Sequence, residues 1–196
     1  GIEGQTPYMA MELLHGENLD DYLLRKTRLP LSELEPIISQ VSRGLRKAHE
    51  TGIVHRDLKP SNIFISRESD GREVVKILDF GIAKLMKSGT KRTATSAVMG
   101  TPLYMSPEQC RGAGEVDERS DVYSLGCTIY ETMTGTPPFR GQNVMETVMK
   151  HFQEKPPTLA SRMPGEYIPP RLEQLIQKSM AKDPGERYQT MLQMGR

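Results

Sequence analysis

The stretch HRDLKPSN at residues 55–62 brings together three side chains that can do chemistry. Asp57 can accept a proton, Lys59 can neutralise negative charge, and Asn62 offers an amide oxygen as a ligand for a hard cation. A carboxylate, an ammonium group and an amide oxygen together suit the handling of a phosphate or of a hydroxyl proton. The elements that position these three residues decide what they act on.

Two β-rich runs follow this cluster and predict an antiparallel hairpin. Residues 63–66 and 74–78 are rich in Ile and Val, and they flank a polar turn that contains an Asp-Gly pair. Asn62 precedes the first run and Asp79 follows the second, so the hairpin brings an amide oxygen and a carboxylate to one edge. One or two oxygen ligands, completed by substrate phosphates, are typical of Mg²⁺. We therefore expect Asn62 and Asp79 to bind Mg²⁺.

A metal site next to a further carboxylate and a further ammonium group suits phosphoryl transfer, which needs positioning and charge neutralisation more than covalent chemistry. In that reaction Asp57 would accept or orient the proton of the attacking hydroxyl, and Lys59 would steady the negative charge on the transferred group. The neighbouring His55 has two interpretations, because it could do acid–base chemistry or could support the loop by packing.

The composition is that of an ordinary globular chain. The 196 residues are 36% hydrophobic and 26% charged, with a formal net charge of +1, so overall charge does not favour nucleic acid or a membrane surface. No apolar run approaches the roughly 20 residues of a membrane span. Cys110 and Cys127 match no disulfide framework or metal spacing, which fits a reducing, cytoplasmic compartment. Cys127 lies in an apolar run, where we expect a buried thiol.

The remaining sequence predicts an α+β, mostly helical domain. Ser32 and Glu35 form a capping-box pattern, and apolar residues then recur at helical spacing as far as Gly52. We expect a strand within residues 6–14, and HGEN at 15–18 indicates a turn. Further helices are predicted at residues 19–26, 107–111, 118–134, 143–152, 170–181 and from 187 onward.

Residues 82–105 are small, polar and rich in Ser and Thr, with basic residues from Lys84 to Arg92. A segment of this length without helix or strand signals predicts a mobile loop that is functional or disordered. The basic residues could form a nucleic-acid patch. They lack interleaved aromatic residues, so we favour a solvated loop and expect no nucleic-acid binding.

Taken together, these motifs resemble those of the eukaryotic-type protein serine/threonine kinase family. The residues around them are similar to those of its bacterial members. HRDLKPSN and DFG at 79–81 resemble the catalytic loop and the metal-binding motif of that family. SPE at 106–108 resembles its A-P-E motif with Ser106 in place of Ala, and SDVYSLGCTIYE resembles the start of its large central helix. The resemblance covers essentially the whole chain and implies the large, C-terminal lobe of a kinase with its small catalytic-loop hairpin.

The resemblance implies that ATP and Mg²⁺ are the cofactors and that Ser and Thr hydroxyls of proteins are the substrates. It makes Asp57 the catalytic base and Lys59 its partner on the phosphate side, with Thr101 bracing both. Asn62 and Asp79 become the metal ligands, in agreement with the argument from the hairpin.

Nucleotide contacts are implied at the start of the chain. Met11 would lie behind the adenine, and Glu12 to Leu14 would form the hinge whose backbone bonds its edge. Residues 1–16 would be the end of the small lobe and the hinge, and residues 17–196 the large lobe. The family's glycine-rich loop, strand lysine and helix glutamate are missing from these residues, so we expect the small lobe to precede Gly1 and this segment alone to be inactive.

Supporting roles follow from the same resemblance. His55 would support the catalytic loop by packing, and Asp121 would hold that loop from below. Glu108 would pair with Arg187. Arg56 would pair with a phosphate in the activation segment.

Residues 79–108 become the activation segment under the resemblance. Thr93 and Thr95 fall where bacterial relatives are often phosphorylated, and a phosphate there would carry up to two negative charges, enough to draw in Arg56. Self-association of two copies would allow each to phosphorylate the other. We expect no membrane contact from this segment, although the parent protein could be membrane-anchored.

Two other classes of function stay open. A pseudokinase or scaffold would bind partners without transferring phosphate, but such proteins usually lose one of the four groups at Asp57, Lys59, Asn62 and Asp79, and all four are present. A phosphotransferase acting on a small molecule is a weaker alternative, because the long threonine-bearing segment favours a peptide substrate.

Overall fold

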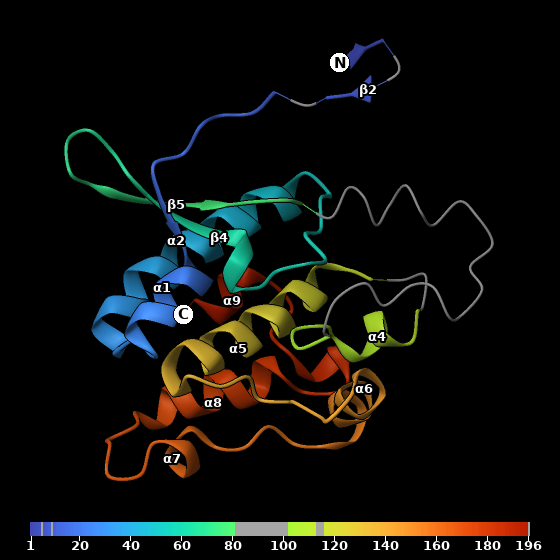
Figure 1. Ribbon diagram of the computed structural model, residues 1–196. Coiled ribbons are helices and arrows are strands. Elements are labelled where there is room, and N and C mark those ends of the chain that lie inside the picture. Colours follow the sequence, from blue (N-terminus) through green and yellow to red (C-terminus); the bar gives the residue numbers. More distant parts are fainter. Residues whose placement is uncertain (5, 9, 81–101, 113–115, 196) are drawn as a thin grey trace.

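A computed structural model of the chain describes residues 1–4, 6–8, 10–80, 102–112 and 116–195. Figure 1 shows a body of packed helices with a small antiparallel sheet at one side. The predicted α+β, mostly helical fold is confirmed. None of the helices in the described ranges is both long and apolar enough to cross a membrane.

The longer helices make up most of this body. They are α1 (Leu19–Lys26), α2 (Leu31–Glu50), α5 (Glu118–Thr134), α6 (Val144–Gln153) and α8 (Pro170–Ser179). Short helical turns connect them: η1 (Pro60–Asn62), α4 (Pro107–Cys110), α7 (Leu159–Arg162), η2 (Pro184–Glu186) and α9 (Met191–Met194). Of these short turns, η1, α7 and η2 were not expected from the sequence.

Helix α5 is the centre of the fold. It packs against α2, α7 and α8 (Figure 1), and its residues are buried nearly all the way round. A helix buried on every side reads as apolar or small in all directions, which fits the run VYSLGCTIY. The side chain of Asp117 caps its N-terminus, and Gly135 ends it in the left-handed conformation, at φ 75°.

The predicted hairpin is confirmed as β4 (Ile63–Arg67) and β5 (Glu73–Ile77), paired antiparallel. A third strand, β3 (Gly16–Asn18), pairs with β4 where the sequence had indicated a turn. Gly16 has φ 146°, and a Cβ there would overlap the carbonyl oxygen of Ile65. The close approach of β3 and β4 therefore requires glycine at this position.

Helix α2 begins differently from the prediction. Its N-cap is Pro30, without a side-chain capping bond, so the capping box expected from Ser32 and Glu35 is wrong. The expected apolar periodicity is present. The buried face of α2 consists of Leu34, Ile37, Val41 and Leu45.

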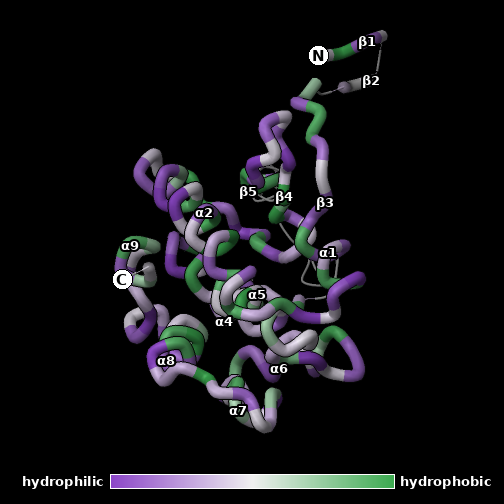
Figure 2. Tube along the Cα trace, turned by 90° about the vertical axis from the view of Figure 1, so that its left-hand side faces the viewer, coloured by the Kyte–Doolittle hydropathy of each residue, from purple (hydrophilic) through white to green (hydrophobic). Residues whose placement is uncertain are grey.

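The N-terminal segment stands away from the helices. Figure 2 shows it separated from the body in a second view as well. This segment contains the short strands β1 (Ile2–Glu3) and β2 (Thr6–Pro7), paired antiparallel, whereas residues 10–15 form neither helix nor strand. The strand expected over 6–14 is therefore wrong for most of its length. Within the described ranges these residues have no neighbouring strand to pair with, and an extended run needs such a partner.

The end of the chain also corrects the sequence analysis. A helix was expected from residue 187, but Arg187 is extended (φ −78°, ψ 174°) and follows η2. Helix α9 begins only at Met191, after the capping residue Thr190. The reason is tertiary, because the side chain of Arg187 turns into the core to meet Glu108.

Candidate active site

The loop that carries HRDLKPSN is fixed to α5 by one buried carboxylate. Asp121, which is fully buried, accepts hydrogen bonds from the backbone N–H of His55 (2.8 Å) and of Arg56 (2.9 Å). Arg56 has φ 65°, a left-handed conformation that is uncommon for a residue other than glycine. Two charge-assisted bonds hold the backbone in this turn.

Both ring nitrogens of His55 form hydrogen bonds with the backbone. Its Nε2 lies 2.8 Å from the carbonyl oxygen of Leu78, and its Nδ1 accepts the backbone N–H of Asp57 at 3.2 Å. A carbonyl can only accept, so Nε2 carries the hydrogen. The ring also packs 4.8 Å from that of Phe80. His55 thus links the loop at residues 55–62 to the residues after β5, and this geometry leaves neither nitrogen for acid–base chemistry.

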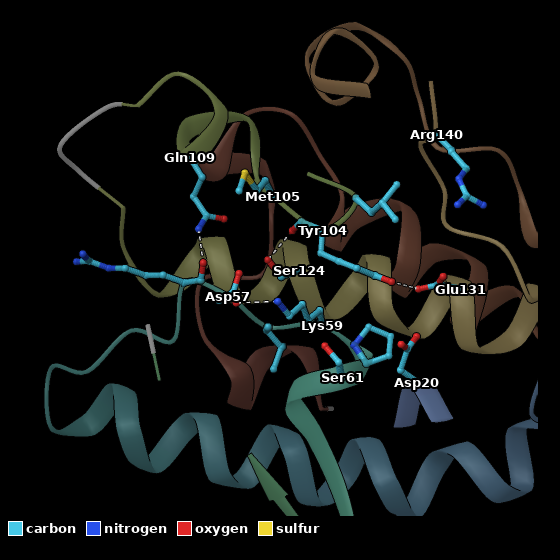
Figure 3. Close-up of a pocket in the computed structure, with 14 residues that line it drawn as sticks. Asp20, Asp57, Lys59, Ser61, Tyr104, Met105, Gln109, Ser124, Glu131 and Arg140 are labelled. Carbon is cyan, nitrogen blue, oxygen red and sulfur yellow. Dashed lines mark hydrogen bonds and ion pairs between the residues drawn. The ribbon is translucent and has the colours of Figure 1, made fainter. Parts of the chain in front are cut away.

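Asp57 is the centre of the cluster (Figure 3). Lys59 Nζ lies 3.0 Å from Asp57 Oδ2, and the two side chains are 37% and 30% exposed. The amide nitrogen of Asn62 donates to the carbonyl oxygen of Asp57 at 2.8 Å and to Oδ2 at 3.3 Å. Lysine and asparagine thus hold one carboxylate oxygen from two sides, while the side chain stays accessible.

The hairpin places Asn62 and Asp79, the residues expected to bind Mg²⁺, at the same end of its paired strands. The backbone N–H of Leu78 donates to the carbonyl oxygen of Asn62 at 2.8 Å, and Asp79 follows directly, in a left-handed conformation with φ 50°. Because the amide nitrogen of Asn62 is used on Asp57, its amide oxygen is the atom that remains for a cation. No cluster of three His, Cys, Asp or Glu in the described residues suits a metal. An amide oxygen and a carboxylate are donors of the kind that Mg²⁺ takes together with substrate phosphates.

A cavity of about 370 Å³ opens beside Asp57 and Lys59. Its lining also includes Asp20, Ser61, Leu103, Tyr104, Met105, Gln109, Ser124, Glu131 and Arg140. Figure 3 shows that these side chains come from separate parts of the chain. None was singled out from the sequence, because no local pattern brings α1, α5 and residues 102–109 together.

The segment at residues 102–110 is tied to both the loop at residues 55–62 and α5. Gln109 Nε2 donates to the carbonyl oxygen of Arg56 at 2.7 Å, and Ser124 Oγ donates to the carbonyl oxygen of Tyr104 at 2.7 Å. The Tyr104 hydroxyl donates to Glu131. Burial raises the pKa of Glu131 and the nearby Asp20 adds to it, while the bond from Tyr104 opposes both.

Glu108 and Arg187 form a buried, two-pronged ion pair. Arg187 Nη1 lies 2.8 Å from Glu108 Oε1, and Nη2 lies 2.9 Å from Oε2. Burial by itself would raise the pKa of Glu108, but the hydrogen bonds and charge of Arg187 outweigh it and lower the pKa to about 2. The pair joins α4 to the residue that follows η2.

The remaining predicted site residues lie elsewhere. Met11, Glu12 and Leu14 belong to the extended segment before β3, where Glu12 pairs with Lys76 of β5. Met11 is 72% exposed, and none of these three lines the cavity beside Asp57.

The three predicted threonines, Thr93, Thr95 and Thr101, lie outside the described residues.

Several known proteins similar to this chain are bacterial kinases. The serine/threonine-protein kinase PknB of Mycobacterium leprae is 41% identical over 191 residues, which cover 97% of this chain and 30% of the relative. The serine/threonine-protein kinase pkn3 of Myxococcus xanthus is 41% identical over 183 residues, covering 92% of this chain and 33% of the relative. The chain therefore spans about a third of the length of these relatives.

A crystal structure of the PknI kinase domain from Mycobacterium tuberculosis, a double mutant, has a similar fold. Its TM-score is 0.69 at 23% sequence identity, covering 94% of this chain and 62% of that chain. At this identity the likeness concerns the fold alone. The model of the family described as protein kinase domain matches residues 2–194, nearly the whole sequence, and the chain belongs to that family.

Proposed function

We propose that the parent protein is a serine/threonine protein kinase that transfers the γ-phosphate of ATP to Ser and Thr hydroxyls of proteins. The observation that carries the proposal is the arrangement of Asp57, whose carboxylate is held by Lys59 and Asn62 at the edge of a cavity. The names of the relatives support the same activity.

In this proposal Asp57 acts on the acceptor hydroxyl. Its carboxylate is held in one orientation yet remains accessible, so it can take or orient the proton as the oxygen attacks. Lys59, one ion-pair distance away, steadies the charge that develops on the transferred group. Asn62 and Asp79 would hold Mg²⁺. ATP supplies the phosphoryl group and Mg²⁺ neutralises its oxygens.

The cavity beside Asp57 supports a protein rather than a small-molecule substrate. Its lining comes from α1, the loop around Asp57, residues 103–105 and Arg140, and a cavity lined from such separate segments suits a peptide whose hydroxyl reaches the carboxylate. Self-association, in which one copy presents its activation segment to another, would use the same cavity. We place this reaction in the cytoplasm.

Further roles belong to the same proposal. The division at residue 16 would separate hinge from large lobe, with Met11 behind the adenine and Glu12 to Leu14 along its edge. Thr101 would brace Asp57. Residues 79–108 would form the activation segment.

Two of its threonines are proposed phosphorylation sites, Thr93 and Thr95. A phosphate on either would recruit the guanidinium of Arg56. Phosphopeptide mapping after incubation with ATP and Mg²⁺ tests this, and finding both threonines unmodified in active protein would contradict it.

The test of the main proposal is Mg²⁺-dependent transfer of radiolabelled phosphate from ATP to a generic Ser/Thr protein. Residues 1–196 would be compared with a chain extended upstream by about 100 residues, the size of a small domain. Asp57→Asn is the blank, and Asp70→Asn, in the exposed turn between β4 and β5, is the matched control.

We expect transfer only from the extended chain and its Asp70→Asn variant. A folded extended chain that binds ATP without transferring phosphate would support the scaffold alternative instead. Transfer that survives Asp57→Asn would refute the role given to Asp57.

A further inference from the structure

A second cavity, of about 390 Å³, lies where the end of α2 meets the start of α5 and the residue before α9. We call it the His49 pocket. It is lined by His49, Gly52, Val54, Asp117, Glu118, Arg119, Gln189 and Thr190. None of these residues lines the cavity beside Asp57, so the two cavities are separate.

His49 presents a buried ring nitrogen that has no hydrogen-bond partner within the described part of the chain. Its side chain is only 4% exposed, and its Nε2 lies 2.8 Å from Asp121 Oδ2. The Asp121 carboxylate already accepts two backbone N–H groups, and an ionised carboxylate can only accept, so Nε2 carries a hydrogen. The other nitrogen, Nδ1, has no hydrogen-bond partner among the residues described. A buried polar atom left in this way calls for an explanation.

Glu118 is the nearest charged group to that nitrogen. Its Oε2 lies 3.6 Å from His49 Nδ1, which is too long for a direct hydrogen bond. In the neutral imidazole Nδ1 is an acceptor, as is the carboxylate, so the two atoms face each other without a hydrogen between them. The pair therefore lacks a donor.

The other polar groups of the pocket already have partners. Asp117 is bound by Arg119, with an Nη2–Oδ2 distance of 2.6 Å, and Arg119 Nη1 also donates to Gln189 at 3.3 Å. The charges of Asp117 and Arg119 cancel. In the part of the chain that the structure describes, Glu118 is thus the one lining charge that no cation offsets.

We propose that the His49 pocket binds a small organic cation with at least two N–H donors, an ammonium or a guanidinium group. A nitrogen about 2.9 Å from each acceptor, the usual N–H···O or N–H···N length, spans two atoms that are 3.6 Å apart. Such a group gives His49 Nδ1 its missing donor and offsets the charge of Glu118. A cation without N–H groups can do only the second.

The pocket is connected to the catalytic loop by a short chain of hydrogen bonds. The cation would contact His49, His49 contacts Asp121, and Asp121 holds the backbone N–H groups of His55 and Arg56. A ligand in the pocket would therefore affect the backbone at His55, two residues before Asp57. The proposal does not depend on phosphate transfer and goes beyond it.

The experiment is an NMR titration of the ¹⁵N-labelled 196-residue chain at pH 8 and constant ionic strength. Ethylammonium is the probe, and tetramethylammonium, which has the same charge but no N–H donor, is the matched control. We expect ethylammonium alone to give a saturable shift of His49 Nδ1 and of the His55 and Arg56 amides. Glu118→Gln should weaken binding at least tenfold, whereas Glu35→Gln, exposed on the same helix as His49, should leave it unchanged.

Three results would overturn the proposal. Equal, non-saturating shifts from both cations would mean that only charge screening occurs. A His49 ring with hydrogens on both nitrogens at pH 8 would mean that a proton already satisfies Glu118. Unchanged affinity in Glu118→Gln, with a spectrum that is otherwise that of the parent chain, would remove the residue from the site.

Discussion

Replacing Glu108 by Gln keeps the shape of a buried side chain and removes its charge. Arg187, whose side chain has no exposed surface, would then be a buried cation without its anion. Breaking a buried pair by removing one partner typically costs about 3–5 kcal/mol. At distances of 2.8 and 2.9 Å the two side chains are in direct hydrogen-bond contact, with no space for a water molecule between them.

The pKa of Glu108 gives a second route to the same magnitude. A fall from the usual 4.5 to about 2 corresponds to about 3 kcal/mol at 1.36 kcal/mol for each unit of pKa. The pKa of Glu108 is lower in the folded than in the unfolded chain. Its contribution to stability is therefore present above pH 4.5 and is lost as the pH falls toward 2. The stability difference between the parent chain and Glu108→Gln should therefore shrink as the pH falls from 5 to 2.

The assay is urea denaturation followed by circular dichroism at several pH values. At pH 7 we expect Glu108→Gln to lose about 3 kcal/mol. The double variant Glu108→Gln/Arg187→Met should lose less than the sum of the single changes, because no unpaired charge remains. Glu50→Gln is the control, since its ion pairs with Arg46 and Lys47 are exposed and should contribute nothing measurable.

Two results would refute this reasoning. A loss below about 1 kcal/mol at pH 7, the range of an exposed pair, would mean that the pair is not effectively buried. A stability difference that stays constant between pH 5 and pH 2 would mean that the pKa of Glu108 is not lowered in the folded chain.

Three further outcomes test the fold and the cavity. Gly16→Ala should lower stability by about 1–3 kcal/mol in the same urea assay, because φ 146° and the adjacent carbonyl oxygen exclude a Cβ. Burial raises the pKa of Cys110 to about 11 and that of Cys127 further, so a thiol reagent at pH 8 should modify Cys110 slowly and Cys127 only in denaturant. Tyr104→Phe removes the bond that opposes the effect of burial, so ¹³C NMR should find a higher pKa for Glu131.

Local patterns predicted most of the elements. The hairpin followed from two β-rich runs around an Asp-Gly turn, and helices α1, α5 and α6 lie within one residue of their expected bounds. The predictions were wrong where a pairing partner distant in sequence decides whether a segment becomes a strand. Residues 10–15 are extended but have no neighbouring strand in the described ranges, and Gly16–Asn18 became a strand because β4 was available to pair with it.

The sequence by itself determined the identity and spacing of Asp57, Lys59 and Asn62, because a loop of eight residues carries them and a hairpin must return Asp79 to the same edge. It could not determine what surrounds them. Asp20 and Glu131 enter the cavity from two helices, and their environment depends on how those helices pack.

Tertiary structure alone decided the buried polar contacts. Asp121 lies 66 residues from His55 and 72 from His49, yet its one carboxylate bonds both. A charged residue in an apolar run indicates that its side chain has partners in the folded protein, because burying an unpaired charge is costly. Only packing selects which partners those are, since hydrogen bonds act over about 3 Å and carry no trace in the sequence between the residues that they join.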